Sequence, residues 1–428
     1  MDQFIIQGGH PLSGTIKPSG NKNAAFPVMA ASLLTEEPVV VHNIPEIEDV
    51  RTFRQLLGEL GVEIERLAPG SYRLQTKTIA AVAPSPHLFG LIRGSLVLTG
   101  ALLGREGQAI LPAPGGDVIG RRRVDTHIQA LQALGATFST NDVMYLQVDR
   151  LQGADLLLDE ASVTGTENTI LAAVLAKGTT IIHNAACEPH VQDLCNLLNL
   201  MGAQIEGVGS NVLTIQGVDR LGGGEFTIGP DYMEVGSFIG LGAVTGGELR
   251  IKNAGARDMR MTQLVLERLG VEVQIEGDDV LVPGEQLLTI VPDMGGGIPE
   301  IKDRPWPGFP PDLMSIAIVI ATQAQGSILF HEWMYESRLY FVDKLIRMGA
   351  RIILCDPHRC LVQGPTWLHG ERVESPDIRA GMALLLAALC ARGTSVISGI
   401  RQIDRGYEKI EEKLRALGAQ IERVSNTD

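Results

Sequence analysis

The sequence predicts an α/β protein of two similar domains, in which central helices are wrapped by sheets. Three observations lead to this fold class. The chain has 428 residues, which is more than one ordinary domain. A short glycine motif recurs six times, and each copy follows an apolar helical segment with a β-branched run behind it. Six such units divide most simply into three plus three.

The glycine motif consists of an apolar residue, a glycine, a small residue and a short β-like run, as in ALGATFS and ALGAQIE. Its glycines are Gly61, Gly135, Gly202, Gly270, Gly349 and Gly418, at intervals of 74, 67, 68, 79 and 69 residues. Coincidental Leu-Gly pairs would not reproduce this spacing together with a second element. We therefore interpret the pattern as an internal repeat.

The second element is an apolar segment, then a glycine or acidic break, then a β-branched run, as in ILAAVLAKGTTIIHN and LLLAALCARGTSVIS. Alanine, leucine and isoleucine with almost no charge predict a helix that is buried on most sides. The Val, Ile and Thr that follow predict a strand. Next comes an amphipathic stretch such as DVRTFRQLLGEL, where Asp49 is a candidate helix cap. Each unit thus predicts a buried helix, a strand, an amphipathic helix and a strand.

Composition narrows the class of protein. Hydrophobic residues make up 45% and charged residues 20% of the chain, which predicts a globular protein throughout. No apolar run reaches the roughly 18 to 20 residues of a membrane span, and the N-terminus lacks the segments of a signal peptide, so we expect a cytoplasmic location. A net charge of −14 should repel nucleic acid and anionic membranes. An anionic ligand therefore needs a local basic site.

The five cysteines form no CxxC pair, which suits a reducing compartment. Cys355, His358 and Cys360 are spaced as metal ligands could be, but an ordinary loop is the interpretation that we favour.

Two lobes of similar build leave a cleft between them, the usual place for a small-molecule site. Four groups of residues are candidates for it, and the first is PSGNKNAAFPVMAA, residues 18–31. Lys22 stands there at the start of a buried helix, where its ammonium and free backbone N–H groups could hold an anion. The alternative is a solvated lysine beside an asparagine cap.

The second group is GGDVIGRRRVD, residues 115–125. Gly115 and Gly116 permit a mobile or tightly turned loop, and the three arginines at 121–123 could hold phosphate or carboxylate in a fork. The alternative is a solvated basic turn. Asp117 in the same loop weakens that alternative.

The third group is RPWPGFPPDLM, residues 304–314, whose prolines fix an extended backbone that ends at Asp312. Asp312 is either the N-cap of the next buried helix or a rigidly held general base.

The fourth group consists of four arginines in or beside apolar helical segments, where a charge must be paired or bind a ligand. They are Arg93, Arg338, Arg379 and Arg405. Asp377 and Asp404 offer structural partners, so ordinary ion pairs remain an alternative for each arginine.

Together these motifs carry a resemblance. SGNKNAA, GGDVIGRRRVDTH, SVTGTENTILAAVLAKGTT, FPPD, DIRA and IDRGYEKIEEKLRALGAQIERV are similar to the successive motifs of the enolpyruvyl transferase family, from residue 1 to about 424. The 5-enolpyruvylshikimate-3-phosphate synthases of that family typically carry serine after the lysine and arginine shortly beyond. This chain has Lys22-Asn23-Ala24, which favours the nucleotide-sugar branch.

The resemblance implies two inside-out α/β barrel domains, each of three repeated β-α-β-α-β-β-like units, with a substrate cleft between them. It implies that the N-terminal strand crosses over, so that residues 1–21 and 232–428 form the C-terminal domain. Residues 22–231 would form the second domain and carry a mobile loop at 113–123. An open-to-closed motion on substrate binding would follow.

The implied reaction transfers the enolpyruvyl group of phosphoenolpyruvate to the 3-hydroxyl of UDP-N-acetylglucosamine and releases phosphate, the first committed step of peptidoglycan precursor synthesis. These two small molecules are the expected partners, with no metal, cofactor, nucleic acid or membrane.

By matching motif positions, the catalytic residues would be Asp117, Lys22, Asp312 and Arg405. Asp117 would supply a proton, and Asp312 would receive one from the hydroxyl. Lys22, Arg122 and Arg405 resemble the clamp on the donor, with Arg338 and Arg379 supporting it. The positions that match substrate-binding residues are Lys22, Asn23, Arg93, Arg122, Arg123, Val124, Asp125, Thr126, Ser162, Val163, Asp312, Met334, Arg338, Arg379 and Arg405.

The sequence departs from the commonest family pattern at several positions. Asp117 stands where most members have a cysteine, and functional relatives with aspartate there exist. Arg123 replaces a proline, and Glu160 falls where some relatives have a lysine that contacts substrate. SVTGT replaces the usual SVGAT, while Pro311 and Met314 replace the frequent threonine and glutamine. These departures leave open a different nucleotide or nucleotide-sugar acceptor. A noncatalytic nucleotide-sugar sensor is the alternative from another class.

Overall fold

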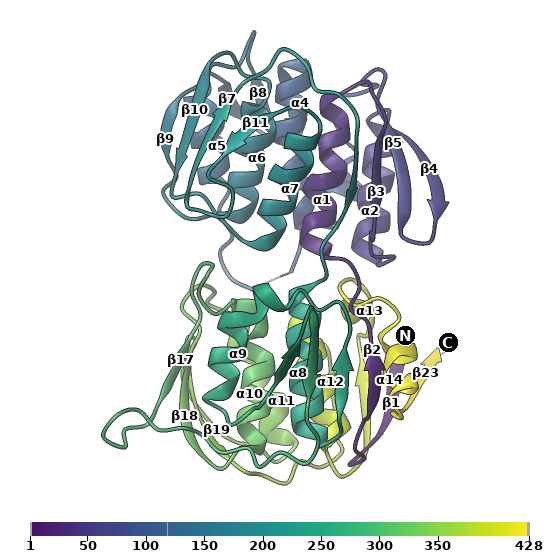
Figure 1. The fold of residues 1–428 in the computed structure, drawn as a ribbon, viewed down its shortest axis with the longest axis vertical. Helices are drawn as coiled ribbons and strands as arrows, with labels where there is room; N and C mark the ends of the chain where they lie inside the picture. The colour runs from purple at the N-terminus through teal and green to yellow at the C-terminus, as the bar shows by residue number, and fades with distance from the viewer. Residues whose placement is uncertain (1, 118, 426–428) are drawn as a thin grey trace. The chain divides into compact units, whose positions relative to one another are not determined.

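The computed structural model describes residues 2–117 and 119–425. These residues form two compact units, each with a hydrophobic core of its own. Unit 1 comprises residues 2–19, 119–121 and 230–425, and unit 2 comprises residues 20–117 and 122–229. Figure 1 shows the course of the chain through the elements of each unit.

Unit 2 contains the first three repeats. The first comprises α1 (Lys22–Ala30), η1 (Ala31–Leu34), β3 (Val39–His42), α2 (Glu48–Glu59), β4 (Glu63–Ala68) and β5 (Ser71–Gln75). The second comprises α3 (Pro86–Phe89), η2 (Arg93–Val97), α4 (Leu98–Glu106), β6 (Gln108–Leu111), α5 (Asp125–Ala133), β7 (Thr137–Thr140) and β8 (Met144–Gln147). The third comprises β9 (Asp155–Leu157), α6 (Val163–Ala173), β10 (Thr179–His183), α7 (Pro189–Leu200), β11 (Gln204–Glu206), β12 (Val212–Gln216) and β13 (Gly224–Thr227).

Unit 1 contains the other three repeats and the first two strands of the chain, β1 (Asp2–Gly8) and β2 (Gly14–Ile16). The fourth repeat comprises α8 (Tyr232–Thr245), β14 (Leu249–Ile251), η3 (Ala256–Met259), α9 (Arg260–Glu267), β15 (Gln274–Glu276) and β16 (Asp279–Val282). The fifth comprises β17 (Glu300–Lys302), η4 (Pro311–Leu313), α10 (Met314–Gln323), β18 (Gly326–His331), η5 (Arg338–Phe341), α11 (Val342–Arg347), β19 (Arg351–Asp356) and β20 (Arg359–Gly364). The sixth comprises β21 (Arg372–Glu374), α12 (Ile378–Cys390), β22 (Gly393–Ser398), α13 (Arg401–Asp404), α14 (Ile410–Ala416) and β23 (Gln420–Ser425).

The strands of the described residues form six sheets, three in each unit, and each sheet is built mainly from the strands of one repeat. Five of them share one design, in which a parallel edge strand precedes an antiparallel set of three: β13-β3-β5-β4, β9-β10-β12-β11, β2-β14-β16-β15, β17-β18-β20-β19 and β21-β22-β1-β23. The sixth is β6-β8-β7. Strand β1 pairs with both β22 and β23, so the first strand of the chain lies in one sheet with the last (Figure 1).

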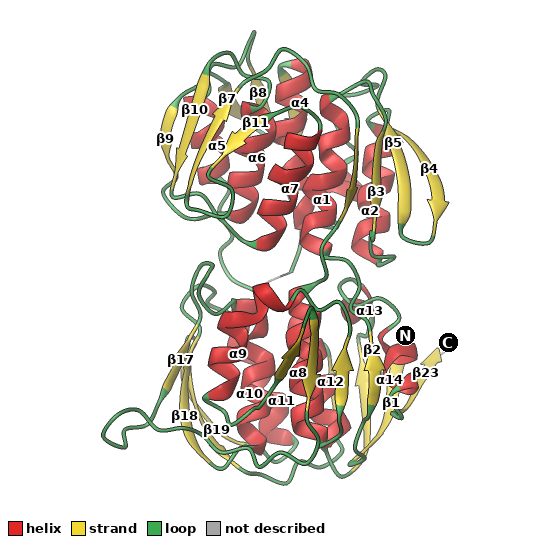
Figure 2. Cartoon of the chain, viewed as in Figure 1, coloured by secondary structure: helices red, strands yellow, loops and turns green. Residues whose placement is uncertain are grey.

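The apolar helix of each repeat lies in the interior of its unit. Helices α8, α10 and α12 contact one another in unit 1, and α4 contacts α1 and α6 in unit 2. Their residues are almost all buried, while the sheets lie outside them (Figure 2). The prediction of central helices wrapped by sheets is therefore confirmed.

A shared backbone conformation explains why glycine recurs in the six motifs. Each adopts a positive φ, between 81° and 102°, just after an amphipathic helix ends and before the next strand begins. A residue with a Cβ is strained in that conformation, so glycine recurs at this turn. One local prediction was wrong: α2 begins at Glu48 with Ile47 as its N-cap, so Asp49 lies inside the first turn and does not cap the helix.

None of the helices in the described ranges is both long enough and apolar enough to cross a membrane.

Candidate active site

In unit 1 the candidate base Asp312 lies within the short helix η4, directly before α10. The N-cap of α10 is Leu313, and no side chain caps that helix, so the cap interpretation of Asp312 was wrong. Instead, each carboxylate oxygen accepts a hydrogen bond from an arginine. Arg338 donates from Nη2 to Oδ1, and Arg379 donates from Nε to Oδ2 at 2.8 Å.

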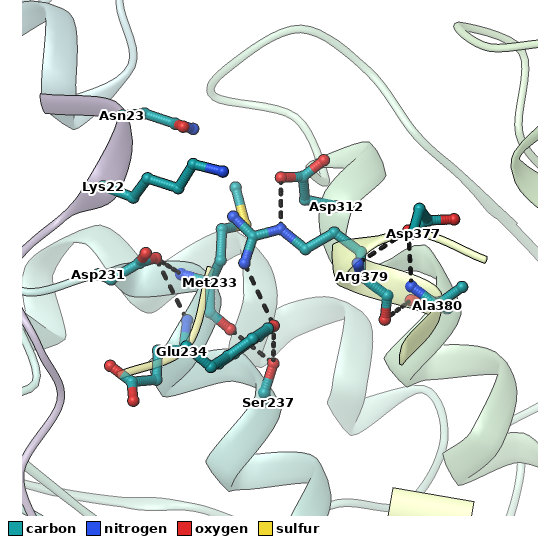
Figure 3. A network of polar contacts seen from close by, with 12 residues as sticks. Lys22, Asn23, Asp231, Met233, Glu234, Ser237, Asp312, Asp377, Arg379 and Ala380 are labelled. Carbon is teal, nitrogen blue, oxygen red and sulfur yellow. Dashed lines mark hydrogen bonds and ion pairs between the residues drawn. The ribbon is translucent and has the colours of Figure 1, made fainter. Parts of the chain in front are cut away.

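The two arginines reach Asp312 from different elements. Arg338 begins η5, and Arg379 is the second residue of α12 and only 6% exposed. Asp377 caps α12 by accepting the backbone N–H groups of Arg379 and Ala380, at 2.8 and 2.9 Å (Figure 3). Because Asp377 binds backbone, the guanidinium of Arg379 pairs with Asp312 instead.

The charges of the two arginines decide the state of Asp312. Burial raises the pKa of its carboxyl, but the charges and hydrogen bonds of Arg338 and Arg379 outweigh burial and hold that pKa well below its usual range. Asp312 is therefore ionised and able to accept a proton, although it is a weak base while both arginines hold it. An anion that drew the guanidinium groups away would raise its basicity.

Arg405 and Met334 are the other candidates in unit 1. Arg405 is the C-cap of α13, and its Nη1 donates to the side chain of Gln402 at 2.7 Å. Asp404 is held by both terminal nitrogens of Arg423, at 2.9 and 2.7 Å. The backbone N–H of Met334 donates to the buried carboxylate of Asp303 at 3.3 Å.

In unit 2 the candidate lysine is the first residue of α1. Asn21 caps this helix by accepting the backbone N–H groups of Asn23 and Ala24, at 2.9 and 3.3 Å. The side chain of Lys22 is only 10% exposed, and its Nζ lies 2.7 Å from a carboxylate oxygen of Asp49. The interpretation of Lys22 as a solvated lysine was therefore wrong.

The arginine loop is held to unit 2 by Arg93. Its Nη2 donates to the carbonyl oxygens of Arg122 and Arg123, at 2.7 and 3.0 Å. Gly116 has a φ of 109°, and a Cβ there would lie 2.8 Å from the Cβ of Arg93. Asp117 and Arg122 are half-buried, whereas Arg123 is exposed. A Cβ at position 116 would therefore disturb the backbone beside Asp117.

Three loop residues cluster with unit 1. The carbonyl oxygen of Ile119 accepts the backbone N–H of Ser337 at 3.1 Å, and the backbone N–H of Arg121 donates to Glu336 at 3.1 Å. The side chain of Arg121 is exposed, as expected for at least one arginine of this run.

The candidate acceptor residues of unit 2 lie at two helix starts. Val124 precedes α5, which begins with Asp125 and Thr126, and Ser162 caps α6, which begins with Val163. Thr126 donates its hydroxyl proton to Asp159. Helix N-termini present free N–H groups, so both starts suit an anionic or polar ligand.

Arg123 interacts with two carboxylates near these helix N-termini. Its Nε donates to Asp125 at 3.0 Å, and its Nη2 lies 3.9 Å from Asp159. The side chain of Glu160 is exposed, and its backbone carbonyl accepts the N–H of Ser162 at 2.7 Å.

Several residues beside the candidate site were missed by the sequence analysis. Asp49 was treated only as a cap, although a charged residue on the apolar face of its helix signals a buried partner. Tyr407, which contacts Arg379, lies inside the motif IDRGYEKI without being singled out. Glu332 and Asp303 carry no motif signal, because only the folded chain brings them to Arg338.

Glu332 is fully buried, and the carboxylate of Asp303 is its neighbour. Burial together with the neighbouring Asp303 carboxylate raises its pKa to about 10, against the lowering effect of Arg338. Asp303 itself accepts backbone N–H groups from Trp333 and Met334.

We therefore expect Glu332→Gln to gain stability over the wild type as the pH rises. A carboxyl with a raised folded-state pKa destabilises the fold increasingly above its unfolded pKa of 4.5, up to about pH 10. The gain should grow by roughly 4 kcal/mol from pH 5 to pH 8, measured at each pH as the difference in free energy of unfolding between the variant and the wild type. Glu422→Gln, at an exposed position in β23, is the control. A gain that does not change with pH would show that Glu332 is ionised in the folded protein.

The described residues contain no group of three His, Cys, Asp or Glu side chains placed to hold a metal ion. His358 contacts the carbonyl oxygen of Glu332 through Nδ1 at 2.7 Å, Cys360 is buried and Cys355 is exposed. Cys355 lies in β19 and Cys360 in β20, so the segment is the turn region of a β-hairpin.

The chain is similar to known proteins over nearly its whole length. The family model of EPSP synthase (3-phosphoshikimate 1-carboxyvinyltransferase) matches residues 6–414. A UDP-N-acetylglucosamine 1-carboxyvinyltransferase of Treponema denticola is 55% identical over 422 residues, which cover 99% of this chain and 99% of the relative. A protein of the same name from Bradyrhizobium diazoefficiens is 54% identical over 99% of this chain and 98% of its own length.

Solved structures give the same fold. The enolpyruvyl transferase NikO of Streptomyces tendae matches with a TM-score of 0.88 and 25% identity over 99% of both chains. An EPSP synthase of Acinetobacter baumannii matches with a TM-score of 0.76 at 19% identity, covering 99% of this chain and 100% of its own. The predicted two-domain α/β fold is thereby confirmed.

Proposed function

The chain belongs to the EPSP synthase (3-phosphoshikimate 1-carboxyvinyltransferase) family, and on this premise we propose that it transfers the enolpyruvyl group of phosphoenolpyruvate to the 3-hydroxyl of UDP-N-acetylglucosamine, with release of phosphate. The observation that carries this proposal is the identity of 55% and 54%, over nearly the whole of both chains, to enzymes named for that reaction. The reaction is a step of peptidoglycan precursor synthesis, and so of cell-wall growth, cell shape and division. The absence of CxxC pairs among the five cysteines supports a cytoplasmic location.

The chemistry requires an acid, a base and a cationic clamp. Protonation of C3 of phosphoenolpyruvate makes C2 electrophilic, and the sugar hydroxyl then attacks C2 and loses its proton. The tetrahedral adduct finally expels phosphate as its C2–O bond to phosphate breaks, and loss of a proton from the C3 methyl group restores the C2–C3 double bond. We assign the acid to Asp117 and the base to Asp312.

The proposed clamp consists of cations. Lys22, Arg122 and Arg405 would neutralise the phosphate and carboxylate of the donor, with support from Arg338 and Arg379. Lys22 already lies in a buried ion pair with Asp49, so an incoming anion would compete with a carboxylate for an ammonium that is largely shielded from water.

The acceptor would be held by residues of the helix starts and of the adjacent loops. They are Asn23, Arg93, Arg122, Arg123, Val124, Asp125, Thr126, Ser162, Val163 and Met334. The guanidinium of Arg123 pairs with the carboxylates of Asp125 and Asp159, and these two ion pairs hold it in place.

Donor binding would also activate the base. In the absence of an anion, Arg338 and Arg379 both hydrogen-bond to Asp312 and suppress its basicity. Phosphoenolpyruvate would attract these guanidinium groups and weaken their hold on the carboxylate. Asp312 would then become more basic when the donor is present to react.

The position of transfer is testable with an acceptor analogue. UDP-N-acetylglucosamine should support phosphate release from phosphoenolpyruvate, whereas its 3-deoxy analogue should support none, because it lacks the attacking hydroxyl. Competition by the analogue would verify that it still binds. Phosphate release with the bound 3-deoxy analogue would refute transfer to the 3-hydroxyl.

We further expect UDP-N-acetylglucosamine to protect residues 113–123 from hydrogen exchange. This loop combines positive-φ glycines, including Gly116 and Gly120, with the proposed acid, and enzymes of this kind exclude water before reaction. Exchange of peptides from this loop should slow on saturation with the nucleotide sugar, while peptides from β4 and β5 serve as an internal control. Unchanged exchange at saturation would count against a ligand-induced closure.

A further inference from the structure

The hydroxyl of Tyr407 lies buried between three elements of unit 1. Tyr407 follows α13 and is 2% exposed. Its hydroxyl lies 3.2 Å from the hydroxyl of Ser237 on α8, and it is also 3.2 Å from Nη1 of Arg379 on α12. No motif of the sequence analysis assigned a role to this side chain, and the catalytic proposal does not use it.

The direction of each hydrogen bond in this set follows from the donors. Ser237 donates its only hydroxyl proton to the carbonyl oxygen of Met233 at 2.8 Å. Its oxygen is thus left as the acceptor for Tyr407. Arg379 can only donate, so Tyr407 accepts from Arg379 and donates to Ser237. The phenol is therefore satisfied on both sides and has one defined orientation.

This arrangement fixes the guanidinium of Arg379 at two edges. Nη1 is held by Tyr407, while Nε donates to Asp312 at 2.8 Å. The guanidinium carbon also lies 5.5 Å from the centre of the Tyr407 ring, within the range of a cation–π contact. Rotation of the guanidinium would break both hydrogen bonds, and it would leave a buried N–H without a partner.

We propose that Tyr407 is a positioning residue, which orients Arg379 so that its Nε faces Asp312 and its charge is available to the donor. This inference rests on the proposed function, because the donor is the anion that would share Arg379 with Asp312. Burial raises the pKa of the phenol, against the effect of the Arg379 charge, so Tyr407 stays neutral and keeps the proton that it donates to Ser237. The nearby carboxylate of Asp231 raises the pKa in the same direction.

Tyr407→Phe is the direct test, because it removes the hydroxyl and keeps the ring. A hydrogen bond to a charged group is lost, so we expect kcat/KM for phosphoenolpyruvate to fall roughly ten- to hundredfold. The KM for the nucleotide sugar should stay within about twofold of the wild-type value, since the change affects the binding of phosphoenolpyruvate and not that of the nucleotide sugar. Ser237→Ala should act in the same direction with a smaller effect, and it provides a second variant if Tyr407→Phe does not fold.

Tyr72→Phe is the matched control. Tyr72 is also buried, at 3% exposure, donates its hydroxyl proton to Glu46 and carries an arginine, Arg54, 4.3 Å from its ring centre. It belongs to β5 of unit 2 and has no place in the proposed mechanism. We expect this variant to lose stability but to keep both kinetic constants.

A second readout does not depend on turnover. In the wild type, the Nε–H proton of Arg379 should exchange slowly with water in NMR spectra, because it is buried and bonded to Asp312. That signal should be lost in Tyr407→Phe and kept in Tyr72→Phe. If the wild type has no transferase activity, the function fails, yet the NMR signal still tests the positioning role. Retained kcat/KM together with a retained Nε–H signal in Tyr407→Phe would overturn the inference, as would equal losses toward both substrates with the signal intact.

Discussion

Replacement of Arg405 by alanine should lower kcat/KM at least a hundredfold, with little change in the melting temperature. Removing a cation that stabilises developing charge typically costs about 3 to 4 kcal/mol of transition-state binding. The fold should tolerate the change, because Arg405 is half-buried and follows a helix of only four residues, outside the hydrophobic core. Steady-state kinetics with both substrates, together with thermal unfolding, measure the two effects.

Arg415→Ala is the matched control for that variant. Arg415 lies on α14 and is exposed, so its removal changes the net charge by the same amount without touching the proposed clamp. Its kinetics should equal those of the wild type. Wild-type kinetics for Arg405→Ala itself would remove Arg405 from the site.

Asp117→Asn should lose most turnover while still binding UDP-N-acetylglucosamine. An amide has no acidic proton to transfer to C3 of phosphoenolpyruvate or to the departing phosphate, whereas a carboxyl group has one. General acid catalysis is worth about 10²- to 10⁴-fold, so the rate should fall within that range. Calorimetric titration of the nucleotide sugar would show that the loss lies in chemistry and not in binding.

Asp117→Cys is the complementary variant. A thiol carries its proton at neutral pH, so this variant should stay active, and it should become sensitive to the epoxide fosfomycin, which alkylates the loop thiol in cysteine-bearing relatives. The wild type should resist fosfomycin, because a carboxylate is a poorer nucleophile than a thiolate. Full activity in Asp117→Asn, or covalent labelling of the wild type, would contradict the role of Asp117.

The fold could be predicted from the sequence because each repeat carries its own signals. Apolar helices without charge, β-branched runs and a glycine that must adopt positive φ all recur, so an error in one copy is corrected by the others. The strand order was beyond such reasoning. The pairing of β1 with β22 and β23 joins residues that lie almost the whole chain apart, and no local pattern encodes it.

The candidate site could be predicted in part. The local composition of the glycine- and arginine-rich loop at 115–125 indicated Asp117, and that of the proline-rich turn at 304–314 indicated Asp312. The partners of the charged groups could not be predicted from local sequence, because an ion pair between η4 and α12 depends on how the helices pack. Asp377 illustrates the limit: sequence proximity suggested it as a partner for the side chain of Arg379, yet it caps the helix through backbone N–H groups.

The central claim is the identity of the acceptor, and phosphate release from phosphoenolpyruvate tests it most directly. The purified protein should be assayed with UDP-N-acetylglucosamine, with UMP and with shikimate 3-phosphate under identical conditions. We expect one phosphate per molecule of UDP-N-acetylglucosamine consumed, and a kcat/KM at least a hundredfold higher than with either alternative, since a site built for one set of polar groups rejects acceptors that lack them. Faster release with UMP or shikimate 3-phosphate would contradict the proposed acceptor, and no release with any of the three would contradict transferase activity itself.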